Sequence, residues 1–391
     1  MQLFAVSAPG LEPIIAAELQ ALGIAARPVP GGAEWDGDVA QLMRALLHVR
    51  CASRVLVRAA GFRARTFFEL ERHARRVPWD RFLSDGDAVT LRITSRKSKL
   101  YHEGAIAERL QAAIAGASRP ASIAVARGDD DDEAVAHAQL FVVRVLRDEF
   151  TISADASGAA LHRRGYRQAL AKAPLRETLA AALLHAAGWH GDVPLLDPLC
   201  GSGTIPIEAA LLARRIPPAL ANPGYAPRVF AFTAWPEHDT AAWATAVAEA
   251  RSAILPHAPS AIAGSDHNAG AIHAARANAE RAGVAADIEW RVAPLDRSPA
   301  REGGIMVTNP PYGVRVVAGG STRSVYVALG DRARSGRQGR LALLSPDPGL
   351  DAALGIPLDE VARTRNGGIA VRLLVGDPQA AGRGRRTQAT G

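Results

Sequence analysis

Two hydrophobic periods alternate along the first 62 residues of the chain. Every second position is apolar at 3–8 and 53–62, which is typical of strands, and the segment 24–37 contains two further short strands. Apolar residues at 11–23 and 39–49 instead follow the spacing of amphipathic helices. The pattern therefore predicts the order β-α-β-β-α-β, which is that of a ferredoxin-like fold.

A second unit follows, with a helix at 67–79, a strand at 88–94, a helix at 105–116 and three strands up to residue 155. The turn SRKSKLYHEG after its first strand is basic. It carries Arg96, Lys97, Lys99 and Tyr101, a set that can pair with phosphates and stack on an unpaired base. A solvated turn without a ligand remains an equal alternative. The sequence thus offers this turn as a candidate RNA contact.

The segment LHRRGYR is predicted to be a linker, and its arginines around Tyr166 are further candidate RNA contacts: Arg163, Arg164 and Arg167. After it, strand and helix patterns alternate up to residue 345. Repeated β-then-α units predict an α/β domain with a parallel sheet covered on both faces. Ligands of such sheets bind at the carboxyl ends of the strands.

Length and composition agree with a multidomain globular chain. The chain has 391 residues, 48% of them hydrophobic, and no apolar run long enough to span a membrane. Its start has neither a cationic segment nor a cleavage site, so we expect a cytoplasmic protein. Cys51 and Cys200 are too few for a metal cluster, and no metal is expected. The net charge of +7, carried almost entirely by arginine, favours a polyanionic partner.

The loop DPLCGSGTIPIE follows the first strand of the α/β domain. Gly201 and Gly203 allow a sharp turn and a close approach to a ligand, and a helix predicted to begin near Thr204 presents its amide end to an anion. A dinucleotide site would need a third glycine where Pro206 stands. The loop therefore indicates a cofactor other than NAD.

The next strand, AIAGSD, ends in Asp266, whose carboxylate suits the two hydroxyls of a ribose. The alternative is that Asp266 caps the helix that follows. Because the glycine-rich loop and this acidic strand end occur on successive strands, we favour ribose binding.

The stretch TNPPY ends what we take as the fourth strand of the domain. Its two prolines lack an N–H group and fix the backbone, which directs the Asn309 side chain and the Pro310 carbonyl outward. Two acceptors suit an amino group with two hydrogens, and Tyr312 can stack on the planar ring that carries it. The motif therefore predicts a site for an exocyclic amine beside a nucleoside cofactor.

These motifs resemble those of S-adenosylmethionine-dependent N-methyltransferases. The whole chain resembles the THUMP-domain RNA guanine-N2 methyltransferases, in particular the branch that acts on 23S ribosomal RNA. The stretches that carry this resemblance are FAVSAPGLEPIIAAEL, GDVAQLMRALLHVRCASRVLVR, FRARTFFEL, SRKSKLYHEGAIAERL, SGAALHRRGYR and APLRETLAAALL. It implies a ferredoxin-like domain (1–58), a THUMP RNA-binding domain (59–158) and a Rossmann-like methyltransferase domain (159–378). We expect residues 379–391 to form a basic, disordered tail.

The resemblance also implies roles for individual residues. It assigns Asp197, Gly201 and Gly203 to the methionine end of the cofactor and Asp266 to its ribose. It assigns Asn309, Pro310 and Tyr312 to the target base. The chain departs from the family pattern at two places. Pro294 stands where an acidic residue usually meets the adenine, which makes Asp296 the candidate for that contact, and Val314 stands where the family usually has glutamate.

Other functions fit part of the pattern. A tRNA guanine-N2 methyltransferase would share every domain. A DNA adenine or protein glutamine methyltransferase would share TNPPY but would not explain the first half of the chain, and an RNA-binding protein without activity would not need the complete set of acceptors. From the resemblance we expect an enzyme that methylates the N2 of a guanine in 23S ribosomal RNA, and the tRNA enzyme stays the main alternative.

Overall fold

The structure, a computed structural model, describes residues 1–126, 138–168, 175–311 and 321–380. Its N-terminal unit has the predicted β-α-β-β-α-β order. The elements of this unit are β1 (Gln2–Val6), α1 (Glu12–Ala21), β2 (Arg27–Val29), β3 (Gly32–Asp36), α2 (Val39–His48) and β4 (Arg54–Arg63). The strands pair antiparallel in the order β2-β3-β1-β4, which confirms the ferredoxin-like fold.

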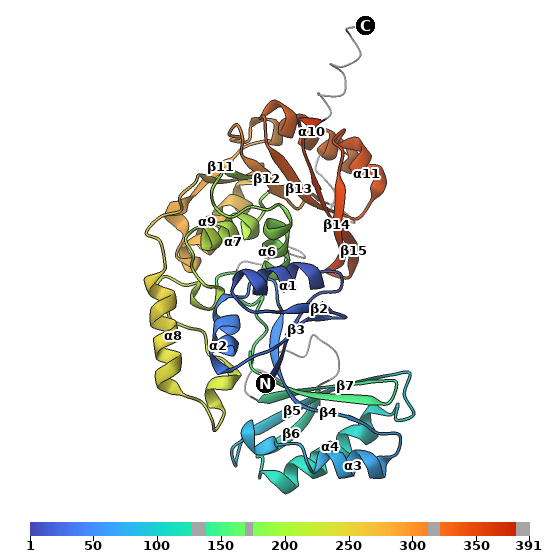
Figure 1. The fold of residues 1–391 in the computed structure, drawn as a ribbon. Coiled ribbons are helices and arrows are strands. Elements are labelled where there is room, and N and C mark those ends of the chain that lie inside the picture. Colours follow the sequence, from blue (N-terminus) through green and yellow to red (C-terminus); the bar gives the residue numbers. More distant parts are fainter. Residues whose placement is uncertain (127–137, 169–174, 312–320, 381–391) are drawn as a thin grey trace.

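The middle unit continues the same sheet. Its elements are α3 (Phe67–Ala74), η1 (Trp79–Arg81), β5 (Ala88–Arg96), α4 (Glu103–Ala117), β6 (Ser122–Ala126), β7 (Gln139–Leu146) and β8 (Glu149–Asp155). β4 pairs with β1 through its first residues and with β8 through the rest of its length, giving one eight-stranded sheet (Figure 1). A bulge between Arg58 and Ala60 bends β4 between the two units.

The C-terminal unit is an α/β domain with one more sheet. Its strands are β9 (Leu195–Asp197), β10 (Ile262–Asp266), β11 (Ile288–Val292), β12 (Ile305–Thr308), β13 (Arg340–Ser345), β14 (Asp359–Asn366) and β15 (Ile369–Gly376). Its helices are α6 (Glu177–Ala186), α7 (Thr204–Ala213), α8 (Thr240–Ser252), α9 (Ala269–Ala282), α10 (Thr322–Ser335) and α11 (Pro348–Ala353), with short 3-10 turns at η2 (Pro218–Leu220), η3 (Ala231–Ala234), η4 (Ala285–Asp287) and η5 (Leu295–Arg297).

The strands of this second sheet have the order β11-β10-β9-β12-β13-β15-β14. The first five are parallel, as predicted, but β15 and β14 are antiparallel, so the sheet is mixed rather than wholly parallel. The reason is the tight turn at Gly367 and Gly368, which both have positive φ and return the chain directly into β15.

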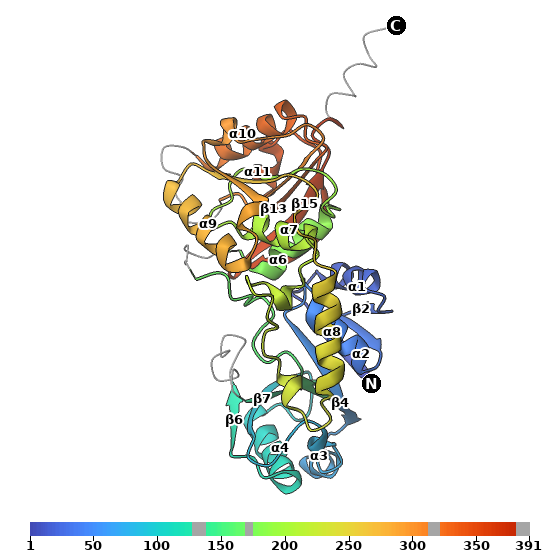
Figure 2. The same cartoon turned by 90° about the vertical axis from the view of Figure 1, so that its left-hand side faces the viewer.

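The segment between α7 and β10 holds the units together. In Figure 2, helix α8 runs alongside α2 of the N-terminal unit, and the two helices are in contact. Before α8, Trp235 Nε1 donates to Gln139 Oε1 of the middle unit at 2.7 Å, and Glu237 lies 3.2 Å from Arg81. Within the part of the chain that the structure describes, no helix combines the length and the apolar character needed to cross a bilayer.

Candidate cofactor and base site

Strands β9 and β12 are neighbours at the centre of the C-terminal sheet, although the strands β10 and β11 lie between them in the sequence. The chain leaves β9 toward β10 on one side and leaves β12 toward β13 on the other. Such a point, where the winding direction reverses, leaves a crevice outside the strand ends. The three predicted motifs follow β9, β10 and β12, so they all lie at this edge.

Asp197, the last residue of β9, is the most buried carboxylate of the site, with 2% of its surface exposed. Its Oδ1 accepts hydrogen bonds from Thr308 Oγ1 at 2.8 Å and from the Leu199 amide at 3.2 Å. Burial nevertheless raises the pKa of Asp197 to about 7, and the nearby charge of Asp266 adds to this effect. A bound cation would favour the ionised carboxylate.

Asp266 ends β10 and connects two loops of the site. Its Oδ2 accepts from the Gly201 amide at 3.1 Å and its Oδ1 from the Asn268 amide at 2.9 Å. Asn268, not Asp266, caps helix α9, so the alternative of a capping role for Asp266 is wrong. Each carboxylate oxygen keeps acceptor capacity for a ligand hydroxyl.

The two glycines of the first loop serve different purposes. Gly201 has φ +52°, and a Cβ placed on it would meet nothing within 4 Å, so its backbone borders open space. A Cβ on Gly203 would lie 2.6 Å from the Trp290 ring and 2.9 Å from Ala275. Gly264 likewise makes room for the Trp290 indole. Gly201 is thus the glycine that a ligand can approach, while Gly203 lets the loop pack on Trp290.

Helix α7 begins at Thr204, where the sequence placed it, with Gly203 as an N-cap that supplies no side chain. Its first amides are therefore not capped by a side chain at this position, and they lie at the site edge. Cys200 in the same loop is buried, and burial raises the pKa of its thiol well above the ordinary value. The thiol stays protonated at neutral pH and is unsuited as a nucleophile.

Asn309 and Pro310 follow β12 directly. The Oδ1 atom of Asn309 is buried and has no hydrogen-bond donor among the described residues. A buried acceptor without a donor is costly unless a ligand supplies one. Tyr312 and Val314 lie outside the described residues.

Asp296 lies in η5, in the loop after β11, and is exposed. The Ala293 amide at the start of that loop donates to the Asp266 carbonyl at 3.0 Å, which brings the loop to the end of β10. The structure thus puts Asp296 near the expected edge of the sheet, without a described contact that fixes its side chain.

The basic turn after β5 is at the surface. Its three cationic residues and Tyr101 are exposed, and Tyr101 has 66% of its surface free. The turn is held by Asp148, which accepts from the Lys99 amide at 2.7 Å. Arg96, Lys97 and Lys99 are therefore free to meet a large ligand.

The arginines around Tyr166 are not equivalent. Arg163 is exposed, but Arg164 is 8% exposed, lies 3.4 Å from Glu208 and donates to the Arg50 carbonyl at 2.6 Å. Arg167 lies 3.5 Å from Glu177. The placement of Arg164 speaks against the predicted RNA contact, because this side chain joins the C-terminal unit to the N-terminal unit.

A possible metal group was not foreseen from the sequence. Glu18, Cys51 and His185 place ligand atoms within 4.8 Å of one another between α1 and α6. The carboxylate of Glu18 already accepts from the Arg50 and Cys51 amides at 2.6 and 3.0 Å, and burial raises the pKa of Cys51. These hydrogen bonds already occupy the Glu18 carboxylate, so the group serves as a polar contact between units.

Sequence reasoning missed Thr308 and Trp290. Thr308 stands directly before NPPY, and its position at the end of β12 beside β9 was the available signal. Trp290 gave no such signal, because its contact with Gly203 and Gly264 depends on the pairing of β10 with β11.

Two family models match the chain. An RMKL-like methyltransferase domain matches residues 164–354, and the RlmL ferredoxin-like domain matches residues 2–56. The first match lies in the C-terminal unit and ends before β14, and the second lies in the N-terminal unit.

Curated proteins are similar over nearly the whole chain. A ribosomal RNA large subunit methyltransferase K/L of Syntrophotalea carbinolica is 35% identical over 96% of this chain and 53% of its own length. A putative RNA methyltransferase of Synechocystis, slr0064, is 32% identical over 95% of both chains. The chain thus spans about half the length of the K/L relatives it matches.

Among solved structures, a putative methyltransferase, SMU.472, crystallised in complex with SAH, is 27% identical and superposes with a TM-score of 0.82. The alignment covers 96% of this chain and 97% of that one. Together with the domain matches and the full-length relative, this similarity places the chain in the family of RMKL-like methyltransferases with an RlmL-type ferredoxin-like domain.

Proposed function

We propose that the protein transfers a methyl group from S-adenosylmethionine to the exocyclic N2 of a guanine in 23S ribosomal RNA. The observation that carries this proposal is the buried Oδ1 of Asn309, which has no donor among the described residues and belongs to the residue that follows Thr308, the partner of Asp197. The names of the K/L relatives support a large-subunit RNA substrate, and the SAH complex of a structural neighbour supports the cofactor.

The residues at the strand ends fit this cofactor. Asp197 is suited to the amino group of its methionine part, Asp266 to its ribose hydroxyls, and the exposed Asp296 to its adenine amino group. The open space at Gly201 leaves room for the cofactor to lie close to the protein backbone. When bound, S-adenosylmethionine supplies a methyl group on a positively charged sulfur.

The chain contributes positioning and electrostatics to the chemistry. Asn309 Oδ1 and the Pro310 carbonyl accept the two hydrogens of the guanine amine, which localises its lone pair and stabilises the positive charge that develops on nitrogen. The surplus proton leaves to water. We assign Tyr312 to stacking on the base, which must leave its helical stack to reach the site.

We also propose how the three units share the work. Residues 1–58 form the ferredoxin-like domain, 59–158 a THUMP domain, 159–378 the methyltransferase domain and 379–391 a basic tail. Arg96, Lys97, Lys99 and Tyr101 of the basic turn, with Arg163, contact RNA. We propose a cytoplasmic location because the proposed substrate is ribosomal RNA.

The test is methylation of purified RNA. The protein is incubated with isotopically labelled S-adenosylmethionine and either unmodified 23S ribosomal RNA or unmodified tRNA, and the digested nucleosides are identified by mass spectrometry. The expected product is labelled N2-methylguanosine from 23S RNA. Label in tRNA only would favour the tRNA alternative, and labelled N6-methyladenosine would refute the assignment of the base.

A further inference from the structure

A pocket of about 400 Å³ lies where all three units meet, and we call it the junction pocket. Ser7 and Arg54 come from the N-terminal unit, Arg92 from β5 of the middle unit, and Arg176 and Arg365 from the C-terminal unit. None of the residues proposed for the cofactor or the base lines it. Its volume lies in the range of pockets that hold small ligands or single nucleotides.

The charge of the junction pocket is one-sided. Five arginines and His162 line it, and its described lining contains neither aspartate nor glutamate. Arg54 is balanced from outside the pocket by its ion pair with Asp155. Arg176 and Arg365 are exposed and form no ion pair with any described residue. The pocket therefore presents cationic groups to whatever enters it.

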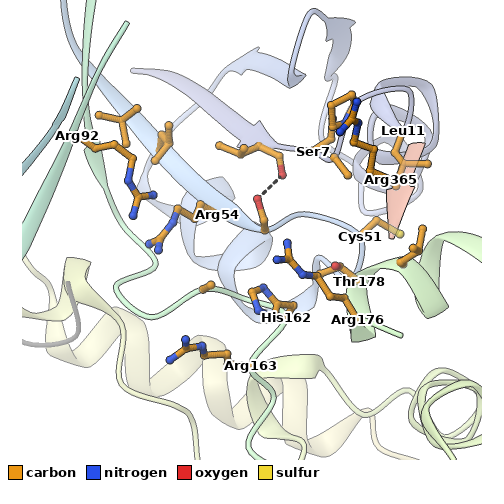
Figure 3. A pocket seen from close by; sticks show the side chains of 18 residues that line it. Ser7, Leu11, Cys51, Arg54, Arg92, His162, Arg163, Arg176, Thr178 and Arg365 are labelled. Carbon is orange, nitrogen blue, oxygen red and sulfur yellow. Dashed lines mark hydrogen bonds between the residues drawn. The ribbon is translucent and has the colours of Figure 1, made fainter. Parts of the chain in front are cut away.

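Figure 3 shows how these side chains are arranged. Arg54, Arg92, His162 and Arg163 gather on one side of the pocket, and Arg365 lies near Leu11 on another side. The guanidinium group carries several donors in a planar fork that matches the oxygens of a phosphate. Side chains from three units thus converge on one space with the chemistry of a phosphate site.

Neutral donors line the same space. Ser7 is 8% exposed, and its hydroxyl has no hydrogen-bond partner within the described part of the chain. Helix α6 begins at the pocket wall, with Arg176 at the N-cap and Thr178 in the first turn, and no side chain caps it. The amide end of this helix adds partial positive charge to that of the arginines.

We propose that the junction pocket binds a backbone phosphate of the RNA substrate, with the attached nucleotide against its apolar wall. Leu56, Val142 and Leu179 provide that wall. The inference deepens the proposed function, because it rests on RNA as the substrate. Since residues of all three units line the pocket, RNA bound there would contact each unit and fix the middle unit relative to the methyltransferase domain.

The test uses the full-length protein and a fluorescein-labelled single-stranded RNA of mixed sequence, with binding followed by anisotropy at several salt concentrations. The variant R176A/R365A removes two cations of the pocket. The matched control R27A/R337A removes two exposed arginines elsewhere, each of which pairs with a glutamate. Binding of S-adenosylhomocysteine, measured by calorimetry, is the control that each variant is folded.

We expect R176A/R365A to bind the RNA roughly ten-fold more weakly and to lose about 0.7 from the slope of log K against log salt, as for one phosphate contact on a single strand. The control should bind like the unmodified protein. Equal losses in both variants, or no loss in R176A/R365A, would overturn the proposal. If the alanine variant fails to bind S-adenosylhomocysteine, the variant R176Q/R365Q is measured instead. The same results for RNA affinity then support or overturn the proposal.

Two further comparisons distinguish a site for RNA phosphate from a site for free phosphate, and distinguish this proposal from the proposed methylation reaction. Inorganic phosphate at millimolar concentration should not displace the RNA, and displacement would point to a site for a free anion instead. The assay reads RNA affinity alone, so it succeeds or fails whichever base the enzyme methylates.

Discussion

Thr308 Oγ1 donates a 2.8 Å hydrogen bond to Oδ1 of Asp197, and this bond joins the ends of β12 and β9. It connects the strand that carries the proposed base site to the strand that begins the proposed cofactor site. It also stabilises the ionised form of a carboxylate whose burial opposes ionisation.

The variant T308V removes this donor while keeping the shape of the side chain. Cofactor affinity should fall by roughly ten- to hundred-fold, since a hydrogen bond to a charged group contributes about 1.5–3 kcal/mol. Calorimetry with S-adenosylhomocysteine measures the effect. T233V is the matched control, because the hydroxyl of Thr233 donates to the Phe230 carbonyl at 2.7 Å, within its own 3-10 turn and away from the site. Unchanged affinity in T308V would show that Asp197 does not depend on Thr308.

The raised pKa of Asp197 predicts a pH dependence with a definite sign. The pKa of about 7 means that this carboxyl is largely protonated at pH 6 and largely ionised at pH 8. A cationic amino group on the ligand needs the ionised form of the carboxyl. Affinity for S-adenosylhomocysteine should therefore rise with pH, by at most about ten-fold per pH unit, and level off above about pH 7.

The same shift predicts the opposite trend for stability without ligand. Because the folded pKa lies above the ordinary value of 3.8, ionisation of Asp197 costs stability, which is lost as pH rises through the interval from 3.8 to about 7. Urea titrations of the unmodified protein and of D197N measure this, since D197N should lose that part of the pH dependence in both assays. If D197N kept the pH profile of ligand binding, the group that titrates would be a residue other than Asp197.

Much of the site followed from the sequence, because strand ends are visible as breaks in apolar runs. Asp197 and Asp266 do end strands, and Asn309 follows one directly, as the patterns predicted. In a parallel sheet these ends share an edge, so three separate motifs could be expected to come together.

The rest depended on contacts between distant residues. Arg164 looked like a solvated linker residue, because nothing nearby in sequence reveals Glu208, its partner on α7. The shared eight-stranded sheet was also not predicted, since β4 reads as a single strand whichever neighbours it has. The NGG stretch between β14 and β15 carried a hairpin signal that could have predicted this antiparallel pair.

The Arg164 and Glu208 pair gives a prediction for stability. R164M leaves Glu208 buried without its cation and should destabilise the fold by about 3–5 kcal/mol, measured by urea unfolding. R164M/E208Q should lose less than R164M, because the uncompensated charge is gone. If R164M were fully stable and bound RNA poorly, Arg164 would act on RNA after all.

Trp290 gives a packing prediction at Gly264. G264A would place a methyl carbon 2.5 Å from the indole ring, an overlap that should cost about 1–3 kcal/mol of unfolding free energy. W290L should recover part of the loss in the same background, as a double-mutant cycle in urea would show. G116A in α4 is the control, since a Cβ there meets nothing within 4 Å. Additive effects of G264A and W290L would contradict the contact.

The last prediction concerns the acceptor at the reacting nitrogen. N309A removes the buried Oδ1 that has no donor among the described residues, while the two prolines keep the backbone in place. Affinities for S-adenosylhomocysteine and RNA should survive, and single-turnover methyl transfer should slow by roughly 10² to 10³, the usual loss for one preorganised contact to the transition state. N309D keeps an acceptor and should retain more activity than N309A. An N309A enzyme that is folded, binds both partners and transfers methyl at the unmodified rate would leave Asn309 without a part in the reaction.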